Sequence, residues 1–227
     1  MKKEEVHARI EEIGIVPAVR VSSSEDARFA AEAVSRGGIP VVEIAMTVPG
    51  ALEVISHLVK TAPEMIVGSG SILDIETARR CADAGAHFLT TDGLVLKVVE
   101  FAVKEHVVVF PGVLTPTEVI AAWEAGSDFV KVVPCASVGG DSYIRSVKAA
   151  LPQVPLIAAG GVNQLTALNF ILSGATALGV GRELIPREAI RLRQSDRIVE
   201  LARRFLSFVN NGRIQAAARR DSIWPRQ

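Results

Sequence analysis

Short runs of apolar residues, many of them β-branched, recur along the chain and alternate with stretches whose apolar residues follow a helical spacing. Each run has the length of one strand and begins roughly 20 to 27 residues after the previous one. The runs are apolar on both faces, as expected for parallel strands between a core and a layer of helices. Strands are predicted at residues 15–20, 39–46, 65–70, 87–92, 107–112, 128–134, 155–161 and 176–181.

The segment between each pair of predicted strands is long enough for one helix. Polar residues that cap helices mark several of the helix starts. Because eight strand–helix units use almost the whole chain, the pattern predicts an α/β fold, a closed (β/α)₈ barrel of the TIM type. Helix starts are predicted at Ser22 with Glu25, at Thr115 with Glu118, at Asp74 and at Asn163.

The predicted units form a single domain with an extension at each end. Residues 1–13 are predicted to form an N-terminal helix that closes the barrel, and residues 14–185 the barrel itself. Residues 186–227 are assigned to the same domain as a C-terminal helical extension and tail. The helix is expected from Pro186 to about Asn211, where apolar residues keep helical spacing. Residues 219–227, RRDSIWPRQ, are expected to be a loose tail.

The composition limits the kinds of molecule that the protein is expected to bind. Of the 227 residues, 49% are hydrophobic, and the formal net charge is zero, so no overall field attracts nucleic acid or an anionic membrane. No apolar run reaches the length of a membrane span, and the charged start lacks a secretory signal. With only two cysteines, Cys81 and Cys135, the protein is expected to be cytoplasmic without structural disulfides. A small-molecule partner is predicted, rather than nucleic acid or a membrane.

Three charged residues lie in or at the end of predicted strands, where a packed core would not select them. Arg20 ends the first strand, Glu43 lies within the second and Lys131 within the sixth. Strands two and six face each other across the barrel, so Glu43 and Lys131 are expected to meet over its centre. A lysine in apolar surroundings loses part of its preference for the charged form and becomes a nucleophile toward ketones. The alternative is a structural ion pair that spans the barrel.

Glycines follow the seventh and eighth predicted strands, where this architecture often binds phosphate. Gly160 and Gly161 precede the helix start at Asn163, and Gly181 precedes Arg182. Backbone N–H groups at such a turn bind phosphate or carboxylate. The alternative is that the glycines only form tight turns. The histidines show no metal-ligand spacing, so no metal site is predicted.

Seven segments, in this order and spacing, resemble the 2-keto-3-deoxy-6-phosphogluconate (KDPG) and 2-keto-4-hydroxyglutarate (KHG) aldolases, which are class I enzymes that form a Schiff base. The resemblance covers roughly residues 10–185. The segments are GIVPAVR at 14–20, VVEIAMTVPGALEVI at 41–55, VGSGSILD at 67–74, PGVLTPTE at 111–118, KVVPCASVGG at 131–140, AAGGV at 158–162 and GVG at 179–181.

The resemblance implies roles for residues at matching positions. Lys131 would be the Schiff-base lysine, Glu43 the general acid and base, and Arg20 a contact of the substrate carboxylate or phosphate. It further implies a homotrimer that uses neither a metal nor another cofactor, and that acts on a small 2-keto acid and pyruvate. The remaining substrate-binding residues would be Thr47, Ser71, Pro111 and Ala159, and the phosphate or anion site would comprise Gly160, Gly161, Gly181 and Arg182.

Several positions depart from the family pattern and bear on the substrate. Thr47 stands where many members have arginine, Ala159 and Ser71 replace threonines, and Arg182 replaces a small hydroxyl residue. The segment HFLTTDGL at 87–94 lacks the serine–proline often found there. The sequence therefore predicts cleavage of a 2-keto-4-hydroxy acid to pyruvate and an aldehyde without choosing the acid. A pyruvate-imine decarboxylase or other lyase, and a catalytically silent barrel that binds a phosphometabolite, are the alternatives.

Overall fold

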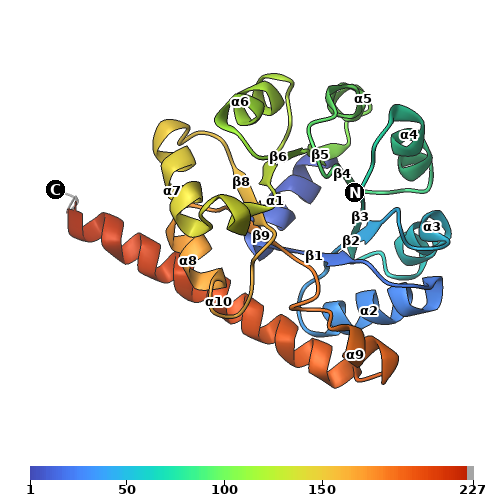
Figure 1. The fold of residues 1–227 in the computed structure, drawn as a ribbon. Coiled ribbons are helices and arrows are strands. Elements are labelled where there is room, and N and C mark those ends of the chain that lie inside the picture. The colour runs from blue at the N-terminus through green and yellow to red at the C-terminus, as the bar shows by residue number, and fades with distance from the viewer. Residues whose placement is uncertain (224–227) are drawn as a thin grey trace.

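The computed structural model describes the backbone of residues 1–223 and the side chains of residues 1–219. Its parallel strands form a ring around a central core, with helices outside (Figure 1). The predicted barrel is thereby confirmed. Its strands are β1 Ile15–Val19, β2 Val41–Ala45, β3 Ile66–Gly70, β4 Phe88–Thr90, β5 Val108–Phe110, β6 Gly112–Val113, β7 Val130–Val132, β8 Leu156–Ala159 and β9 Ala177–Val180.

The fifth predicted strand is divided into β5 and β6 at Pro111. β5 pairs with β4, whereas β6 pairs with β7, so the two halves join the ends of the sheet. Proline has no N–H to donate to a ladder, which explains a break in regular pairing at this position. The amide of Lys131 still donates to the carbonyl of Pro111 at 2.9 Å, and that of Asp128 to the carbonyl of Val109 at 2.9 Å. These hydrogen bonds link the two ends of the sheet to each other.

The helices between the strands begin largely where capping residues predict. Asp74 accepts from the amide of Thr77, and Thr115 and Glu118 form a complete capping box. The helices are α2 Ser24–Arg36, α3 Ala51–Thr61, α4 Ile75–Asp83, α5 Leu96–Lys104, α6 Pro116–Glu124, α7 Asp141–Ala150 and α8 Ala167–Leu172, with a 3₁₀ turn η1 at Cys135–Val138.

Two of the predicted helix starts are wrong in detail. The cap of α2 is Ser23, whose side chain accepts from the amide of Asp26, and not Ser22. Asn163 instead accepts from the amide of Leu165 at 2.8 Å and so stabilises a turn that precedes α8. In both places several polar residues adjoin the helix start, and only the backbone conformation decides which of them faces the free amides.

The N-terminal helix α1, Lys3–Ile13, lies behind the strands in Figure 1. Val6 and Ile10 are buried, and the ring of His7 stacks on Phe129 with centroids 4.4 Å apart. Phe129 lies just before β7, so α1 covers the N-terminal ends of the strands. The opposite, C-terminal ends remain accessible.

The C-terminal extension differs from its prediction in two ways. It consists of α9, Arg187–Arg191, and the long α10, Ser195–Ile223, because Arg193 adopts a positive φ of 51° between them. Helix α10 also continues beyond residue 211 through residues expected to form a loose tail; residues 224–227 of that tail lie outside the described residues. Helix α10 packs along α2 and α8 (Figure 1), so tertiary contacts extend it.

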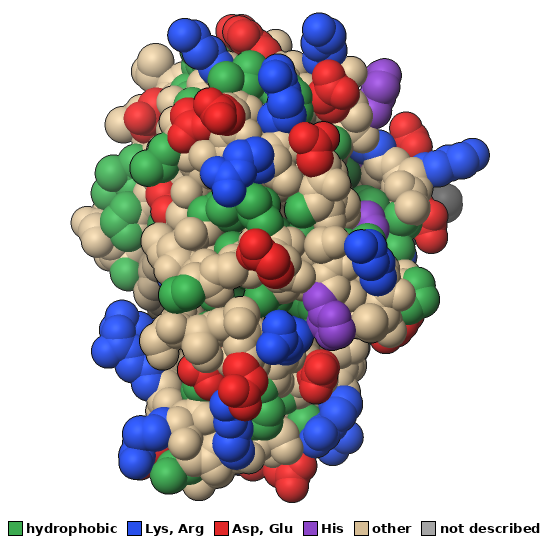
Figure 2. Space-filling model, turned by 90° about the vertical axis from the view of Figure 1, so that its right-hand side faces the viewer, with side chains coloured by type: hydrophobic (Ala, Val, Ile, Leu, Met, Phe, Trp, Pro, Cys, Tyr) green, Lys and Arg blue, Asp and Glu red, His purple; other side chains and the backbone are tan. Residues whose placement is uncertain are grey.

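Acidic and basic side chains alternate on the face drawn in Figure 2, without a broad patch of one sign. This distribution agrees with the zero formal net charge. Within the described residues, none of the helices combines the length and apolar character that a bilayer crossing requires.

Candidate active site

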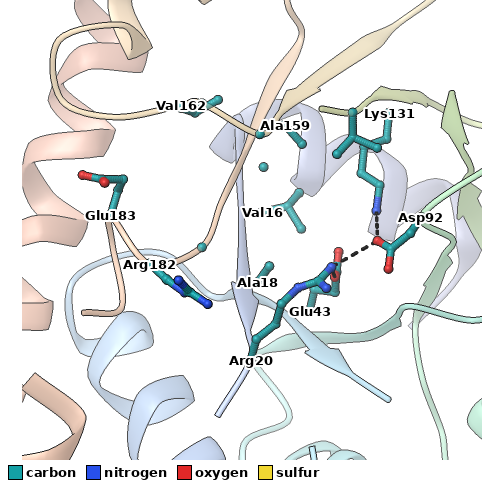
Figure 3. A pocket seen from close by; sticks show the side chains of 15 residues that line it. Val16, Ala18, Arg20, Glu43, Asp92, Lys131, Ala159, Val162, Arg182 and Glu183 are labelled. Carbon is teal, nitrogen blue, oxygen red and sulfur yellow. Dashed lines mark hydrogen bonds and ion pairs between the residues drawn. The ribbon is translucent and has the colours of Figure 1, made fainter. Parts of the chain in front are cut away.

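A cavity of about 410 Å³ opens at the C-terminal ends of the strands (Figure 3), where enzymes with this architecture carry their active sites. Its wall combines charged side chains with backbone of the turns after β8 and β9. Fifteen residues line it: Val16, Ala18, Arg20, Glu43, Asp92, Lys131, Val133, Ala159, Gly160, Gly161, Val162, Gly179, Gly181, Arg182 and Glu183.

Lys131 rises from the middle of β7 into this cavity. Its side chain is only 6% exposed, and its strand neighbours Val130 and Val132 are buried. The amine Nζ lies 3.8 Å from Oδ1 of Asp92. Alternate residues of a strand point to opposite faces, so the strand directs Lys131 inward while its two neighbours pack outward against helices. The amine of Lys131 therefore lies inside the cavity, next to the carboxylate of Asp92.

Glu43 enters the same cavity from β2. It is 3% exposed, and its Oε1 has no hydrogen-bond partner among the described residues. A Cβ atom on Gly70, in the adjacent β3, would lie only 2.0 Å from this oxygen, so the glycine provides the space that the carboxylate occupies. The nearest cation is Arg20, whose Nη2 lies 4.0 Å from Oε1. A buried carboxylate oxygen without a partner is costly, which indicates a group positioned for a ligand.

Glu43 and Lys131 share the cavity, but they do not form the direct pair expected from the strand order. Asp92 contacts the lysine instead, and its Oδ1 also accepts a hydrogen bond from Nη2 of Arg20 at 3.1 Å. The dashed lines in Figure 3 trace this chain of charges from Lys131 through Asp92 to Arg20. The alternative of a structural Lys131–Glu43 bridge therefore lacks its defining contact within the described residues.

Asp92 is the residue that the sequence interpretation missed. Burial raises the pKa of this carboxyl, but the Ser71 hydroxyl, Lys131 and Arg20 outweigh that effect and hold its pKa below the usual value. It is therefore ionised at neutral pH. The signal was present, because Asp92 ends the predicted strand 87–92 just as Arg20 ends 15–20. The departure of this segment from the family pattern does not by itself indicate a role for Asp92.

The turn after β8 presents backbone to the cavity. Gly160 and Gly161 have φ values of 75° and 93°, and a Cβ atom on Gly161 would lie 2.2 Å from that of Ala136. Both glycines are therefore required by the backbone and the packing. In the described part of the chain, the amides of Gly161 and Val162 donate to no other protein group. These free N–H groups can bind an anion.

The remaining predicted site residues divide between the cavity wall and positions away from it. Ala159, Gly181 and Arg182 line the cavity with the residues described above. Thr47 instead lines a neighbouring cavity, and Pro111 is buried between β5 and β6. The Ser71 hydroxyl is buried near Asp92, whose pKa it lowers, and Ser71 lines neither cavity.

A family model described as KDPG and KHG aldolase matches residues 6–201. The KHG/KDPG aldolase of Escherichia coli (strain K12) is 28% identical over 190 residues, which cover 83% of this chain and 89% of that protein. The probable 2-dehydro-3-deoxy-6-phosphogalactonate aldolase of Rhizobium meliloti (strain 1021) is 31% identical over 172 residues, 75% of this chain and 81% of that protein.

Solved structures of similar fold belong to the same class of aldolase as these sequence relatives. The KDPG aldolase of Legionella pneumophila, with pyruvate captured as a covalent carbinolamine, has 26% identity and a TM-score of 0.81, covering 87% of this chain and 96% of that one. The KDPG aldolase of Zymomonas mobilis ZM4 with 3-phosphoglycerate has 25% identity and a TM-score of 0.82, covering 91% and 97%. The resemblance found in the sequence motifs is confirmed. The chain belongs to the KDPG and KHG aldolase family, and it is an aldehyde-lyase.

Proposed function

We propose that this aldolase cleaves a 2-keto-4-hydroxy acid to pyruvate and an aldehyde through an imine on Lys131. The observation that carries the proposal is the position of this amine, 6% exposed, at the base of a cavity at the C-terminal ends of the strands. An amine held in such a cavity is the nucleophile that imine chemistry requires. The carbinolamine of pyruvate captured in the Legionella pneumophila relative supports the same chemistry here.

The reaction begins when the neutral amine of Lys131 attacks C2 of the keto acid. The carbinolamine loses water and becomes an iminium ion. Removal of the proton from the C4 hydroxyl then breaks the C3–C4 bond, and the bonding electrons pass to the iminium nitrogen. The aldehyde leaves, and an enamine of pyruvate remains on Lys131. Protonation of its C3 carbon and hydrolysis of the resulting iminium release pyruvate and restore the amine.

Glu43 is the group that we assign to proton transfer. Its Oε1 lies in the cavity without a hydrogen-bond partner among the described residues, so it can accept the proton of the C4 hydroxyl. The same carboxyl can then return that proton to C3 of the enamine. Such a group contributes about 10²- to 10⁴-fold to a rate. Arg20 would bind the carboxylate of the keto acid, in competition with Asp92.

Borohydride trapping tests the imine directly. Pyruvate and borohydride are expected to add one pyruvate-derived mass to the protein, located by peptide analysis on Lys131 and absent from Lys131→Ala. The matched control is Lys148→Ala, because Lys148 is another partly buried lysine whose pKa is lowered by burial, and its amine donates to the carbonyls of Pro152 and Val154 outside the catalytic cavity. An adduct that survives Lys131→Ala, or that disappears with Lys148→Ala, would refute the proposal.

The homotrimer and the cytoplasmic location implied earlier remain predictions. Large apolar side chains support an assembly, because Leu73, Ile75 and Leu96 stay 70%, 43% and 43% exposed near the starts of the adjacent helices α4 and α5. Light scattering coupled to size-exclusion chromatography is expected to give three times the mass of one chain. A monomer mass would contradict the trimer and leave the imine proposal unaffected.

A further inference from the structure

In the described part of the chain, Asp92 is the one carboxylate that contacts the amine of Lys131. Its Oδ1 lies 3.8 Å from Nζ, whereas Glu43 and Lys131 form no ion pair among the described residues. Figure 3 shows the amine of Lys131 pointing at Asp92, with Glu43 beside Arg20. The side chain of Asp92 is 40% exposed at the cavity wall, so it can also exchange protons with water. The cavity therefore holds two carboxylates in different positions relative to the proposed nucleophile.

The backbone on both sides of this contact is fixed by packing. In the sheet, Gly112 of β6 lies opposite Lys131 of β7. A Cβ atom on Gly112 would lie 2.6 Å from the carbonyl carbon of Asp92, so the turn after β4 can pack this closely on β6 only because the residue is glycine. The buried hydroxyl of Thr91 joins the same segments, because it accepts from the amide of Gly112 at 3.2 Å and donates to the carbonyl of Gly93. Strand pairing and turn packing thus hold the carboxylate beside the amine.

Imine formation moves protons from nitrogen to oxygen. An amine that contacts a carboxylate is held as the ammonium ion, which has no lone pair for attack on a ketone. On the way from ammonium and ketone to iminium ion and water, the nitrogen of Lys131 gives up two protons and the oxygen on C2 gains two. A carboxylate beside Nζ can transfer both, because it has one oxygen for the nitrogen and another for the oxygen on C2.

We propose that Asp92 transfers these two protons and is the general acid and base of carbinolamine formation and dehydration. The inference rests on the proposed function, because it requires the imine on Lys131. Asp92 accepts one proton from the ammonium, the free amine attacks C2, and Asp92 returns that proton to the new oxyanion. It then accepts the second proton from the nitrogen and gives it to the hydroxyl. The C–O bond breaks, water leaves, and the nitrogen lone pair forms the C=N bond. Glu43 keeps the transfers at the C4 hydroxyl and at C3.

The contact with Arg20 couples this role to substrate binding. Burial raises the pKa of the Asp92 carboxyl, but the Ser71 hydroxyl, Lys131 and Arg20 outweigh burial and hold the pKa below its usual value. When the carboxylate of a keto acid binds Arg20, Asp92 loses one of the contacts that lower its pKa. Asp92 then becomes a stronger base beside Lys131. The amine is thus deprotonated once the keto acid is bound.

Time-resolved trapping with pyruvate tests this role. The enzyme is mixed with pyruvate, quenched with borohydride at successive times and measured by intact mass, which gives both the rate and the final extent of imine formation. Asp92→Asn is expected to slow this rate by about 10²- to 10⁴-fold, the contribution of a general acid–base group. The final extent should not fall, because ammonium and iminium carry the same charge beside residue 92. An unchanged rate would overturn the proposal, and so would a lower final extent, which would mean that Asp92 only positions the lysine.

Glu43→Gln separates the roles of the two carboxylates. Its rate of imine formation is expected to stay close to that of the native enzyme, whereas deuterium exchange into the methyl group of pyruvate, followed by NMR, should fall about 10²- to 10⁴-fold. Slow imine formation in Glu43→Gln together with a native rate in Asp92→Asn would assign every proton transfer to Glu43 and overturn the proposal. Asp141→Asn is the control, because Asp141 pairs with Arg145 outside the catalytic cavity, and both rates should equal the native ones.

Failure of the imine itself would look different. If borohydride traps no pyruvate on Lys131 of the native enzyme at any time, the proposed function is refuted, and the role of Asp92 with it. If Asp92→Asn traps pyruvate on Lys131 at the native rate, the imine stands and only the role of Asp92 is refuted.

Discussion

Oδ1 of Asp92 lies 3.8 Å from the amine nitrogen of Lys131. The same oxygen accepts a hydrogen bond from Arg20 at 3.1 Å, so one carboxylate contacts both the proposed nucleophile and the arginine proposed to bind the keto acid. Asp92 also lies in the segment 87–94, which lacks the serine–proline often found in the family. In the proposed mechanism, this carboxylate would compete with the substrate for Arg20.

We predict that Asp92→Asn lowers KM for the keto acid. Without the negative charge, the guanidinium of Arg20 is available to the substrate carboxylate, and one charged hydrogen bond corresponds to about a tenfold change. Steady-state kinetics with Asp141→Asn as control measure the effect, since Asp141 is an acidic residue paired with Arg145 outside the catalytic cavity. A higher KM in Asp92→Asn alone would mean that Asp92 itself binds the substrate.

Asp92 also makes the free energy of unfolding depend on pH in the acidic range. The pKa of Asp92 is below its ordinary value of 3.8 in the folded protein, so its ionised form favours folding. That contribution is fully present above the unfolded-state pKa and is lost as the pH falls through the lower folded-state pKa. Below about pH 4, urea unfolding should therefore show a flatter decline for Asp92→Asn than for the native protein. Parallel declines of the free energy of unfolding in the two proteins would contradict a stabilising contact of Asp92 with Arg20 and Lys131.

Gly70→Ala is expected to inactivate the enzyme without unfolding it. The new Cβ atom would lie 2.0 Å from Oε1 of Glu43, so the carboxylate must leave its position. Loss of a general acid–base group lowers kcat by about 10²- to 10⁴-fold. Gly93→Ala is the control, because a Cβ atom there meets nothing within 4 Å. An active Gly70→Ala enzyme would show that Glu43 does not need this position.

Both described cysteines are expected to resist alkylation while the protein is folded. Burial, followed by the charge of Asp141, raises the pKa of Cys135 to about 11, and burial raises that of Cys81. The thiolate is the reactive form, so iodoacetamide at pH 8 should modify neither residue in the native protein. In urea, mass spectrometry should detect two modifications. Rapid labelling of native Cys135 would contradict its burial in the 3₁₀ turn η1 after β7.

Ser23→Ala should destabilise the fold by about 1 kcal/mol, whereas Ser22→Ala should leave the free energy of unfolding unchanged. Ser23 accepts a hydrogen bond from the amide of Asp26 at 3.1 Å and caps α2. Ser22 forms no such bond among the described residues. Chemical denaturation of the two variants measures the difference. Equal destabilisation by both would contradict the assigned cap.

The sequence by itself determined the barrel and the positions of its central charged residues. Apolar runs with β-branched residues require buried strands, and their regular recurrence leaves few arrangements besides a closed ring. Because a charge inside such a run must face a cavity or a partner, Lys131 and Glu43 were found from the pattern alone. The family motifs were equally visible, since they lie in the same strand ends.

Only the tertiary structure decided what those charges contact. Asp92 reaches Lys131 because β4 ends at the same rim of the barrel, and Arg187 joins Arg20 because α9 returns beside the turn after β1. Hydrophobic periodicity specifies which side of an element is buried, but it carries no information on which polar side chains from distant elements meet. The extent of α10 was undetermined for a similar reason, since packing against α2 and α8 stabilises it.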